Sequence, residues 1–289
     1  PHVDAVEEGP RSRRRNGRAA ANAAGGAGQG VSRRCFIFGL GYSAGRIAEA
    51  MEGHGWEIVS TGRSGSLSFD DSSNVRMALA DADAVLSSVP PSADGDPVLA
   101  AYGADITAHK VVYLSSTGVY GDTGGAWVDE TAPTGTGRRT ARAEADAAWL
   151  ERSARVLRLP GIYGPGRSAL DRVREGRAHR IQLEPQVFSR VHVDDIVSAA
   201  VLAFAAPPGA YNIADDEPPR QNAVIEEACR LLAIAPPPLQ SLDEAGLSPM
   251  ARAFYAENRR VANGKARRAL GWEPRFPPYP QGLRPLPPA

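Results

Sequence analysis

A glycine-rich turn near residue 40 has the residue types and the spacing of a phosphate-binding loop. The apolar run Phe36-Ile-Phe-Gly39 leads into Gly41 and Ala44, and a helical pattern follows. Gly39 permits a tight turn, Gly41 lets the backbone approach a pyrophosphate, and the small Ala44 lets the helix pack closely on the strand. The free N–H groups at the start of the helix then face the phosphates. Glycine turns occur in many proteins, but the flanking strand and helix agree here, so we predict a dinucleotide site.

The end of the next apolar run, Ile58-Val-Ser-Thr61-Gly-Arg63-Ser64, indicates which dinucleotide binds. In a dinucleotide-binding fold this segment lies beside the adenosine ribose, where an acid would bind the 2′-hydroxyl of NAD. The segment has no acid, whereas Arg63, Thr61 and Ser64 offer donors to the 2′-phosphate of NADP. A solvated turn arginine is the alternative. We predict NADP, with NAD as the second choice. The predicted cofactor site comprises Gly39, Gly41, Tyr42, Ser43, Ala44, Thr61, Arg63, Ser64, Ser88, Val89, Pro90 and Arg139.

Hydroxyl groups lie at the end of the fourth apolar run, at Ser115, Ser116 and Thr117. Ligands of doubly wound sheets bind at the carboxyl ends of the strands, so these hydroxyls are placed to face a substrate. The alternative is that they cap the end of the strand, as Ser and Thr often do.

The elements that position these residues alternate along the chain. Apolar runs at 35–38, 57–60, 84–89, 111–115 and 155–159 predict strands, and the stretches 43–52, 75–80, 97–104 and 141–152 predict helices. This alternation is typical of a parallel sheet with helices on its faces. We therefore predict an α/β fold with a doubly wound parallel sheet, its cofactor-binding core spanning residues 33–160.

The second half of the chain, residues 161–289, has a different pattern. We interpret it as a small C-terminal substrate lobe. Within it, residues 187–213 are expected to supply further elements of the central sheet. The pattern predicts helices at 169–174, 195–205, 222–233 and 264–270, and strands at 187–191 and 210–213. The tail from Pro274 is too rich in proline for regular structure.

Composition and charge exclude several classes of protein. No apolar run reaches the roughly 18 residues that a membrane span requires. Beyond residue 34, 26 basic residues stand against 30 acidic ones, which argues against a nucleic-acid-binding surface. Cys35 and Cys229 are typical of reduced, buried thiols in a cytoplasmic protein.

Residues 1–32 show no apolar periodicity and are predicted to be a disordered leader, with a transit peptide or an upstream extension as alternatives.

Several segments resemble the extended short-chain dehydrogenases/reductases, the NAD-dependent epimerase/dehydratase family with a Rossmann fold. The matching segments are Ser115-Ser-Thr-Gly-Val-Tyr-Gly121, Arg158-Leu-Pro-Gly-Ile-Tyr-Gly-Pro-Gly166, Ser189-Arg-Val-His-Val-Asp-Asp195, Tyr211-Asn-Ile-Ala-Asp215 and Ala269-Leu-Gly-Trp-Glu-Pro274. Several motifs in the right order are more specific than any one alone. The resemblance implies that Ser116 bonds the substrate oxygen that gains or loses a proton, and that Thr117 lines the same pocket. These are our two candidate catalytic residues.

The acid/base pair of that family, a Tyr followed four residues later by a Lys, is missing from this sequence. The corresponding stretch, 133–144, has Thr136 and Thr140 at the two positions, with Arg138 and Arg139 between them. Arginine cannot act as a base near neutral pH, although it can hold a ribose or an anion. In this departure the chain resembles the atypical branch of the family.

Two functions are consistent with these features. The first is an NAD(P)-dependent oxidoreductase or epimerase/dehydratase that transfers hydride on a small or nucleotide-linked carbonyl or hydroxyl substrate. The second is a non-catalytic NADP-binding regulator or scaffold. We expect a small-molecule substrate and no nucleic acid, membrane or metal, and a homodimer stays open.

Other charged residues receive simpler interpretations. Asp194 is interpreted as a helix cap and not, with His192, as a metal ligand. Arg158, Arg167 and Arg190 are candidates for holding an anionic substrate, with solvation or ion pairing as the alternative.

Overall fold

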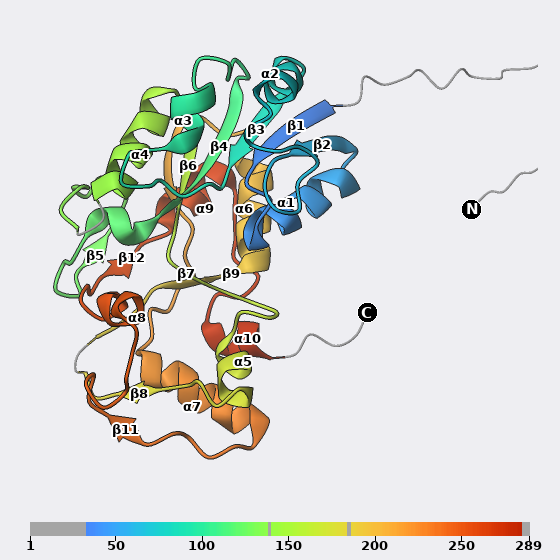
Figure 1. Ribbon diagram of the computed structural model, residues 1–289. Coiled ribbons are helices and arrows are strands. Elements are labelled where there is room, and N and C mark those ends of the chain that lie inside the picture. Colours follow the sequence, from blue (N-terminus) through green and yellow to red (C-terminus); the bar gives the residue numbers. More distant parts are fainter. Residues whose placement is uncertain (1–32, 138–139, 184–185, 285–289) are drawn as a thin grey trace, which may run out of the picture. The chain divides into compact units, whose positions relative to one another are not determined.

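The computed structural model describes residues 33–137, 140–183 and 186–284. The predicted leader at 1–32 and the predicted cofactor residue Arg139 lie outside the described residues. The central element is a six-stranded sheet in the order β10-β6-β4-β3-β1-β2, with all neighbouring strands parallel (Figure 1). Its strands are β1 (Arg33–Phe38), β2 (Trp56–Ser60), β3 (Ala84–Ser87), β4 (Lys110–Ser116), β6 (Arg155–Leu159) and β10 (Gly209–Asn212).

The strands form where apolar residues are buried on both faces of the sheet. β3 is buried along its whole length, and β4 is exposed only at its first residue and partly exposed at its last. Continuous apolar runs of this kind are expected of parallel strands covered by helices on both sides. The predicted doubly wound α/β fold is thus confirmed.

Helices cover both faces of this sheet and create two separate apolar cores. On one face lie α1 (Tyr42–Gly53), α6 (Val193–Ala203) and α9 (Gly264–Leu270). On the other face lie α2 (Ser72–Ala80), α3 (Pro97–Tyr102) and α4 (Thr140–Glu151). The first core also buries Trp272 completely, and the Trp272 indole donates to the Asp195 carbonyl at 3.0 Å. Trp272 therefore packs in the core on this face of the sheet.

Local sequence explains where the helices begin. Asp96 caps α3 by accepting hydrogen bonds from the backbone N–H groups of Val98 and Leu99 at 2.9 and 3.0 Å, and Pro97 occupies the first turn. The second Asp96 oxygen accepts from the indole of Trp149 on α4 at 2.8 Å. One carboxylate thus starts α3 and fixes α4 beside it.

A smaller lobe is built mainly from residues after β6. Its elements are β7 (Gly161–Tyr163), α5 (Ala169–Arg174), β8 (Arg180–Ile181), β9 (Arg190–His192), α7 (Gln221–Leu232), β11 (Leu239–Gln240), α8 (Pro249–Phe254) and α10 (Tyr279–Leu283). Its apolar core joins α5, α7 and α10. Two short pieces, the 3₁₀ helix η1 (Thr117–Tyr120) and the strand β5 (Trp127–Val128), follow β4, and β5 pairs with β12 (Arg260–Val261).

Three sequence expectations require correction in this half. The strand predicted at 187–191 is β9, which spans only 190–192 and pairs with β7. The helix predicted from residue 195 begins at Val193, and its N-cap is His192, whose Nδ1 accepts from the Asp194 N–H at 3.2 Å. The tail from Pro274 is not irregular throughout, because α10 forms with a proline in its first turn, where no backbone donor is needed. No helix among the described residues is long and apolar enough to cross a membrane.

Candidate functional site

A cleft of about 570 Å³ opens at the carboxyl ends of β1, β3, β4 and β6, and residues of the smaller lobe form its other wall. Eight of the predicted site residues line it, namely Gly41, Tyr42, Ser43, Ala44, Ser88, Pro90, Ser116 and Thr117. Residues some 75 positions apart in the sequence, such as Gly41 and Thr117, thus line one cleft. The carboxyl edge of a doubly wound sheet is where such folds bind ligands.

The glycine turn after β1 has the geometry that its residue types predict. Gly39 has φ +81°, and a Cβ there would lie 3.0 Å from the Val89 side chain and 3.1 Å from Ser88 Oγ. A Cβ on Gly41 would instead meet nothing within 4 Å. Gly41 is the N-cap of α1, has no side chain to cap the helix, and the first turn of α1 contains no acid. The start of α1 is therefore an open, electropositive helix end that faces the cleft.

The end of β2 packs directly against this turn. The Leu40 N–H donates to the Thr61 carbonyl at 2.8 Å, and the Gly39 N–H donates to Thr61 Oγ1 at 3.3 Å. Thr61 is buried by these contacts, so it supports the turn and does not line the cleft. Arg63 and Ser64 follow it as exposed residues beside the turn. The predicted cofactor residues Gly39, Thr61, Arg63, Ser64 and Val89 are thus not among the lining residues of the cleft.

The hydroxyls at the end of β4 have different surroundings. Ser116 is the N-cap of η1, where its Oγ accepts from the Gly118 N–H at 3.1 Å. Thr117 is buried and lines the same part of the cleft. Ser115 also lines the cleft, but its hydroxyl donates to the buried Asp146 at 2.6 Å. Ser116 therefore caps η1, as the alternative interpretation expected. Its residue also lines the cleft.

The three candidate arginines differ in position. Arg158 is 3% exposed and forms a bidentate pair with Asp146 at 2.7 and 3.1 Å, so it is a structural ion pair. Arg190 is not among the lining residues of the cleft, and burial lowers the pKa of its guanidinium. Arg167 lines the cleft, and its guanidinium lies 5.7 Å from the centre of the Tyr42 ring.

The stretch 133–144, which corresponds to the acid/base region of the family, contains no Tyr and therefore no phenol. The Thr136 hydroxyl donates to the Tyr120 carbonyl at 2.9 Å, and Thr136 is not among the lining residues. Arg142 on α4 does line the cleft and donates to the Tyr113 hydroxyl at 3.3 Å. Burial raises the pKa of Tyr113 to about 12 and also raises the pKa of Tyr120 and of Tyr163. These buried phenols are therefore poor proton carriers near neutral pH.

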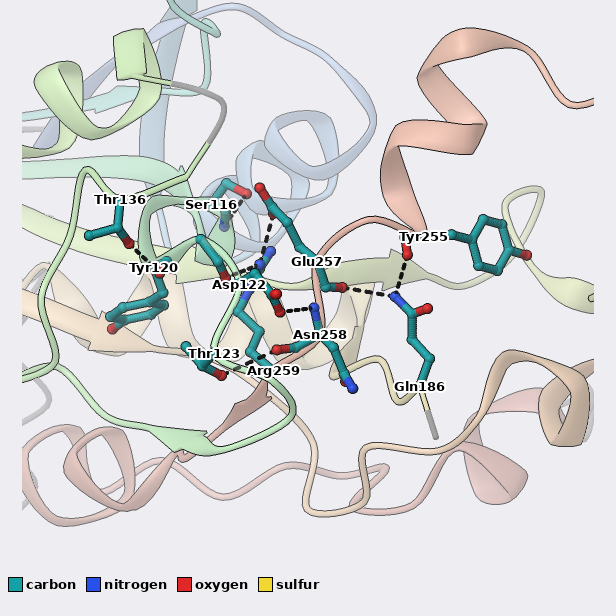
Figure 2. A network of polar contacts seen from close by, with 12 residues as sticks. Ser116, Tyr120, Asp122, Thr123, Thr136, Gln186, Tyr255, Glu257, Asn258 and Arg259 are labelled. Carbon is teal, nitrogen blue, oxygen red and sulfur yellow. Dashed lines mark hydrogen bonds and ion pairs between the residues drawn. The ribbon is translucent and has the colours of Figure 1, made fainter. Parts of the chain in front are cut away.

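Sequence reasoning missed a polar network on the lobe side of the cleft (Figure 2). Glu257 and Arg259 line the cleft and form an ion pair at 2.8 Å. Phe188 and Phe254 stack face to face beside them, with ring centres 4.4 Å apart. The residues after α8 lie in short, irregular segments, where no periodic pattern marks them as part of a site.

Metal ligation finds no basis among the described residues, which contain no group of three His, Cys, Asp or Glu side chains arranged to hold an ion. His192 is buried, and its Nδ1 lies 3.6 Å from Asp194, which also approaches Arg46 at 3.9 Å. Asp194 thus belongs to the first turn of α6 and is not its cap.

Comparisons with known proteins place the chain among related sequences. No protein-family model matches it. A functionally unknown conserved protein of Silicibacter pomeroyi, whose structure is solved, is 39% identical with a TM-score of 0.77, over 87% of this chain and 96% of that one. Protein YeeZ of Escherichia coli K12 is 28% identical over 281 residues, 83% of this chain and 95% of YeeZ. The 3-diazoavenalumate denitrifying reductase of a Streptomyces species is 35% identical over 160 residues, about half of each chain.

More distant solved structures share the fold. Human epimerase family protein SDR39U1, solved with NADPH, is 14% identical with a TM-score of 0.70, over 86% of this chain and 97% of that one. The dTDP-glucose 4,6-dehydratase of Bacillus anthracis, solved with NAD, is 16% identical with a TM-score of 0.69, over 87% of this chain and 94% of that one. At such identities the likeness establishes the Rossmann-like fold of epimerases and dehydratases. The chain therefore belongs to the same family as the conserved Silicibacter pomeroyi protein, and it has the fold of the NAD-dependent epimerases and dehydratases.

Proposed function

We propose that the cleft binds NADP and that the protein transfers hydride between this cofactor and a carbonyl or hydroxyl group of a small or nucleotide-linked substrate. One observation carries the proposal: the open helix end at Gly41 and the hydroxyl of Ser116 line a single cleft. A dinucleotide needs the first feature for its diphosphate, and a carbonyl substrate needs a donor such as the second.

The residues present fit the dinucleotide. The space beside Gly41 admits a diphosphate, and the uncapped N–H groups of the first turn of α1 can donate to it. Arg167 adds a positive charge on the same wall. Arg63 follows Thr61, which is bonded to the glycine turn, and in this proposal it binds the ribose 2′-phosphate. The NADPH in the human structure and the reductase name of the Streptomyces relative support a nicotinamide cofactor here as well.

The chain's own residues have distinct tasks in this proposal. A bound nicotinamide supplies the hydride acceptor or donor. Because Ser116 Oγ accepts the Gly118 N–H, its position is fixed and its proton can be donated to the substrate oxygen. Thr117 forms the neighbouring wall, and the stacked rings of Phe188 and Phe254 supply an apolar boundary that limits water.

A second function, a non-catalytic NADP-binding regulator, is favoured by one observation. In the part of the chain that the structure describes, the residue of α4 that lines the cleft is Arg142, which is no proton donor near neutral pH. Binding of the dinucleotide is common to both functions, so only turnover separates them.

The test is NADPH oxidation by the purified protein across a panel of aldehydes, ketones and sugar nucleotides, with Ser116→Ala beside it. The proposal predicts turnover of at least one substrate and a loss of roughly 100-fold in kcat for the variant. Tight NADPH binding without any turnover would instead identify a regulator. The control Ser198→Ala lies on α6, where Ser198 is not a lining residue, and is expected to keep full activity.

A further inference from the structure

Glu257 stands out among the described residues that line the cleft, because it is the one carboxylate there. Its side chain is 14% exposed, so it is mostly buried yet still reaches the cleft. Ser116, Thr117 and Gly118 line the same cleft. Figure 2 shows the Ser116 side chain and the Glu257 carboxylate directed toward the same region.

The backbone around Glu257 is fixed from both sides. The Gln186 side chain donates to the carbonyls of Tyr255 and Glu257 at 2.8 and 3.0 Å. The Asn258 N–H donates to Asp122 at 2.9 Å, and the Asn258 carbonyl accepts from the Thr123 N–H at 3.0 Å (Figure 2). The segment that carries Glu257 is thereby joined to the loop after η1, which begins at the carboxyl end of β4. A carboxylate held this way is preorganised relative to Ser116.

Positively charged side chains lie around Glu257 in the cleft. Arg259 donates to Glu257 Oε2 at 2.8 Å and to the Gly121 carbonyl at 2.6 Å. Arg142 on α4 and Arg167 on the segment after β7 face the cleft from other walls. Asp122, the acid on the neighbouring loop, is occupied by the backbone N–H groups of Asn258 and Gly124. Glu257 is therefore a negative charge placed among positive ones.

Other groups in the cleft are unsuited to carry a proton. The Tyr42 hydroxyl donates to the Pro165 carbonyl at 3.0 Å, and burial raises its pKa. The lining residues that the structure describes include no histidine and no lysine. Hydroxyls of Ser and Thr can relay a proton, but they stay protonated at neutral pH and do not act as a base on their own.

From this geometry we infer that Glu257 is the acid/base group that exchanges a proton with the substrate oxygen at Ser116, an inference that rests on the proposed function. In the oxidation direction, with an oxidised nicotinamide bound, the carbinol C–H bond would break and its electron pair would be transferred as hydride to that cofactor. The O–H proton passes to the Glu257 carboxylate, directly or across the Ser116 hydroxyl, and a C=O bond forms. In the reduction direction the protonated Glu257 returns that proton to the oxygen.

This placement can be tested without knowing the substrate. An oxidised nicotinamide ring carries a positive charge and a reduced one does not, so a carboxylate beside it favours NADP⁺ over NADPH. Glu257→Gln removes that carboxylate and is expected to raise the ratio of the Kd for NADP⁺ to the Kd for NADPH by about tenfold. This is the size of effect that a charge–charge interaction equivalent to about one pKa unit produces. The NADPH Kd itself changes little. Fluorescence titration with NADPH, followed by competition with NADP⁺, measures both constants.

Matched variants separate charge from structure. Glu257→Asp keeps the charge and is expected to keep most of the wild-type ratio. Glu144→Gln removes an exposed acid from α4, outside the lining, and is expected to leave the ratio unchanged. Thermal melts confirm that each variant folds, and Gln at 257 can still accept the Arg259 hydrogen bond.

The outcomes separate the two proposals. If the wild type binds NADPH and Glu257→Gln has the wild-type ratio, the inference is overturned and the proposed function survives. If the wild type binds neither dinucleotide, the proposed function fails and this inference fails with it. On any substrate that turns over, Glu257→Gln is expected to lower kcat by about 100-fold or more, and an unchanged kcat overturns the inference.

Discussion

Arg63 is the residue that decides which cofactor we expect. It follows Thr61, whose carbonyl and hydroxyl both accept hydrogen bonds from the glycine turn, so the backbone fixes its position relative to that turn. Its exposure leaves the guanidinium accessible to a ligand. A bidentate contact between guanidinium and phosphate is strong and geometrically specific, which makes discrimination by this one side chain physically reasonable.

Replacing Arg63 by alanine tests this role. We expect NADPH affinity to fall about 10- to 100-fold, because loss of a charge-assisted hydrogen bond costs about 1.5–3 kcal/mol, while NADH affinity stays nearly constant. Calorimetric titration of each dinucleotide measures the effect. Arg230→Ala, which removes an exposed arginine paired with Glu227 on α7, serves as the control. An equal loss for NADPH and NADH would sink the assignment.

Individual residues could be predicted from sequence where their type has a local reason. Gly39 and Gly41 were found because a turn with positive φ and an open helix start need glycine. Glu257 and Arg142 could not be found this way, because their place in the cleft depends on how remote segments pack. The same limit applies to Arg158, whose buried partner Asp146 lies on another element.

At the scale of elements, apolar periodicity located the main strands and helices of the sheet within two or three residues. It did less well in the lobe, where short strands are defined by their partners. The strand expected from residue 187 starts only at Arg190, because the Phe188 N–H bonds the Pro219 carbonyl and Phe188 meets Arg259 in an isolated bridge. Backbone contacts of this kind cannot be predicted from the spacing of hydrophobic residues.

Asp215, which follows β10, links this element to β9 and makes stability depend on pH. Its N–H donates to the Arg190 carbonyl at 2.8 Å, and burial raises the pKa of its carboxyl to about 8. In the unfolded chain the pKa is about 3.9. Between these values the folded protein retains a proton that the unfolded chain has released. The free energy of unfolding therefore falls as pH rises from about 4 to about 8.

Asp215→Asn removes this dependence, since the amide does not titrate. Between about pH 5 and about pH 8, we expect the wild type to lose on the order of 2–4 kcal/mol more of its free energy of unfolding than the variant does. Urea unfolding at the two pH values measures the difference. Parallel pH profiles for the two proteins would show that Asp215 is already ionised in the folded state.

At the scale of the described chain, the sheet brings its own strand ends and a lobe from the second half of the sequence around one cleft. The alternation of strands and helices predicted this architecture, and the solved relatives share it. The same architecture serves many reactions, so the fold alone does not name one. What distinguishes this cleft is that its lining combines the start of α1, which has neither a capping side chain nor an acid in its first turn, with Ser116 and Glu257.

Dinucleotide binding in this cleft is the claim on which the rest depends, and calorimetric titration of the wild type and of Gly41→Val with NADPH tests it most directly. The space around Gly41 is open, so the valine is expected to fold normally while its side chain occupies the room that a diphosphate needs. We predict one NADPH bound per wild-type chain and an affinity at least about tenfold lower in the variant. No binding by the wild type, or equal binding by both proteins, would contradict the account.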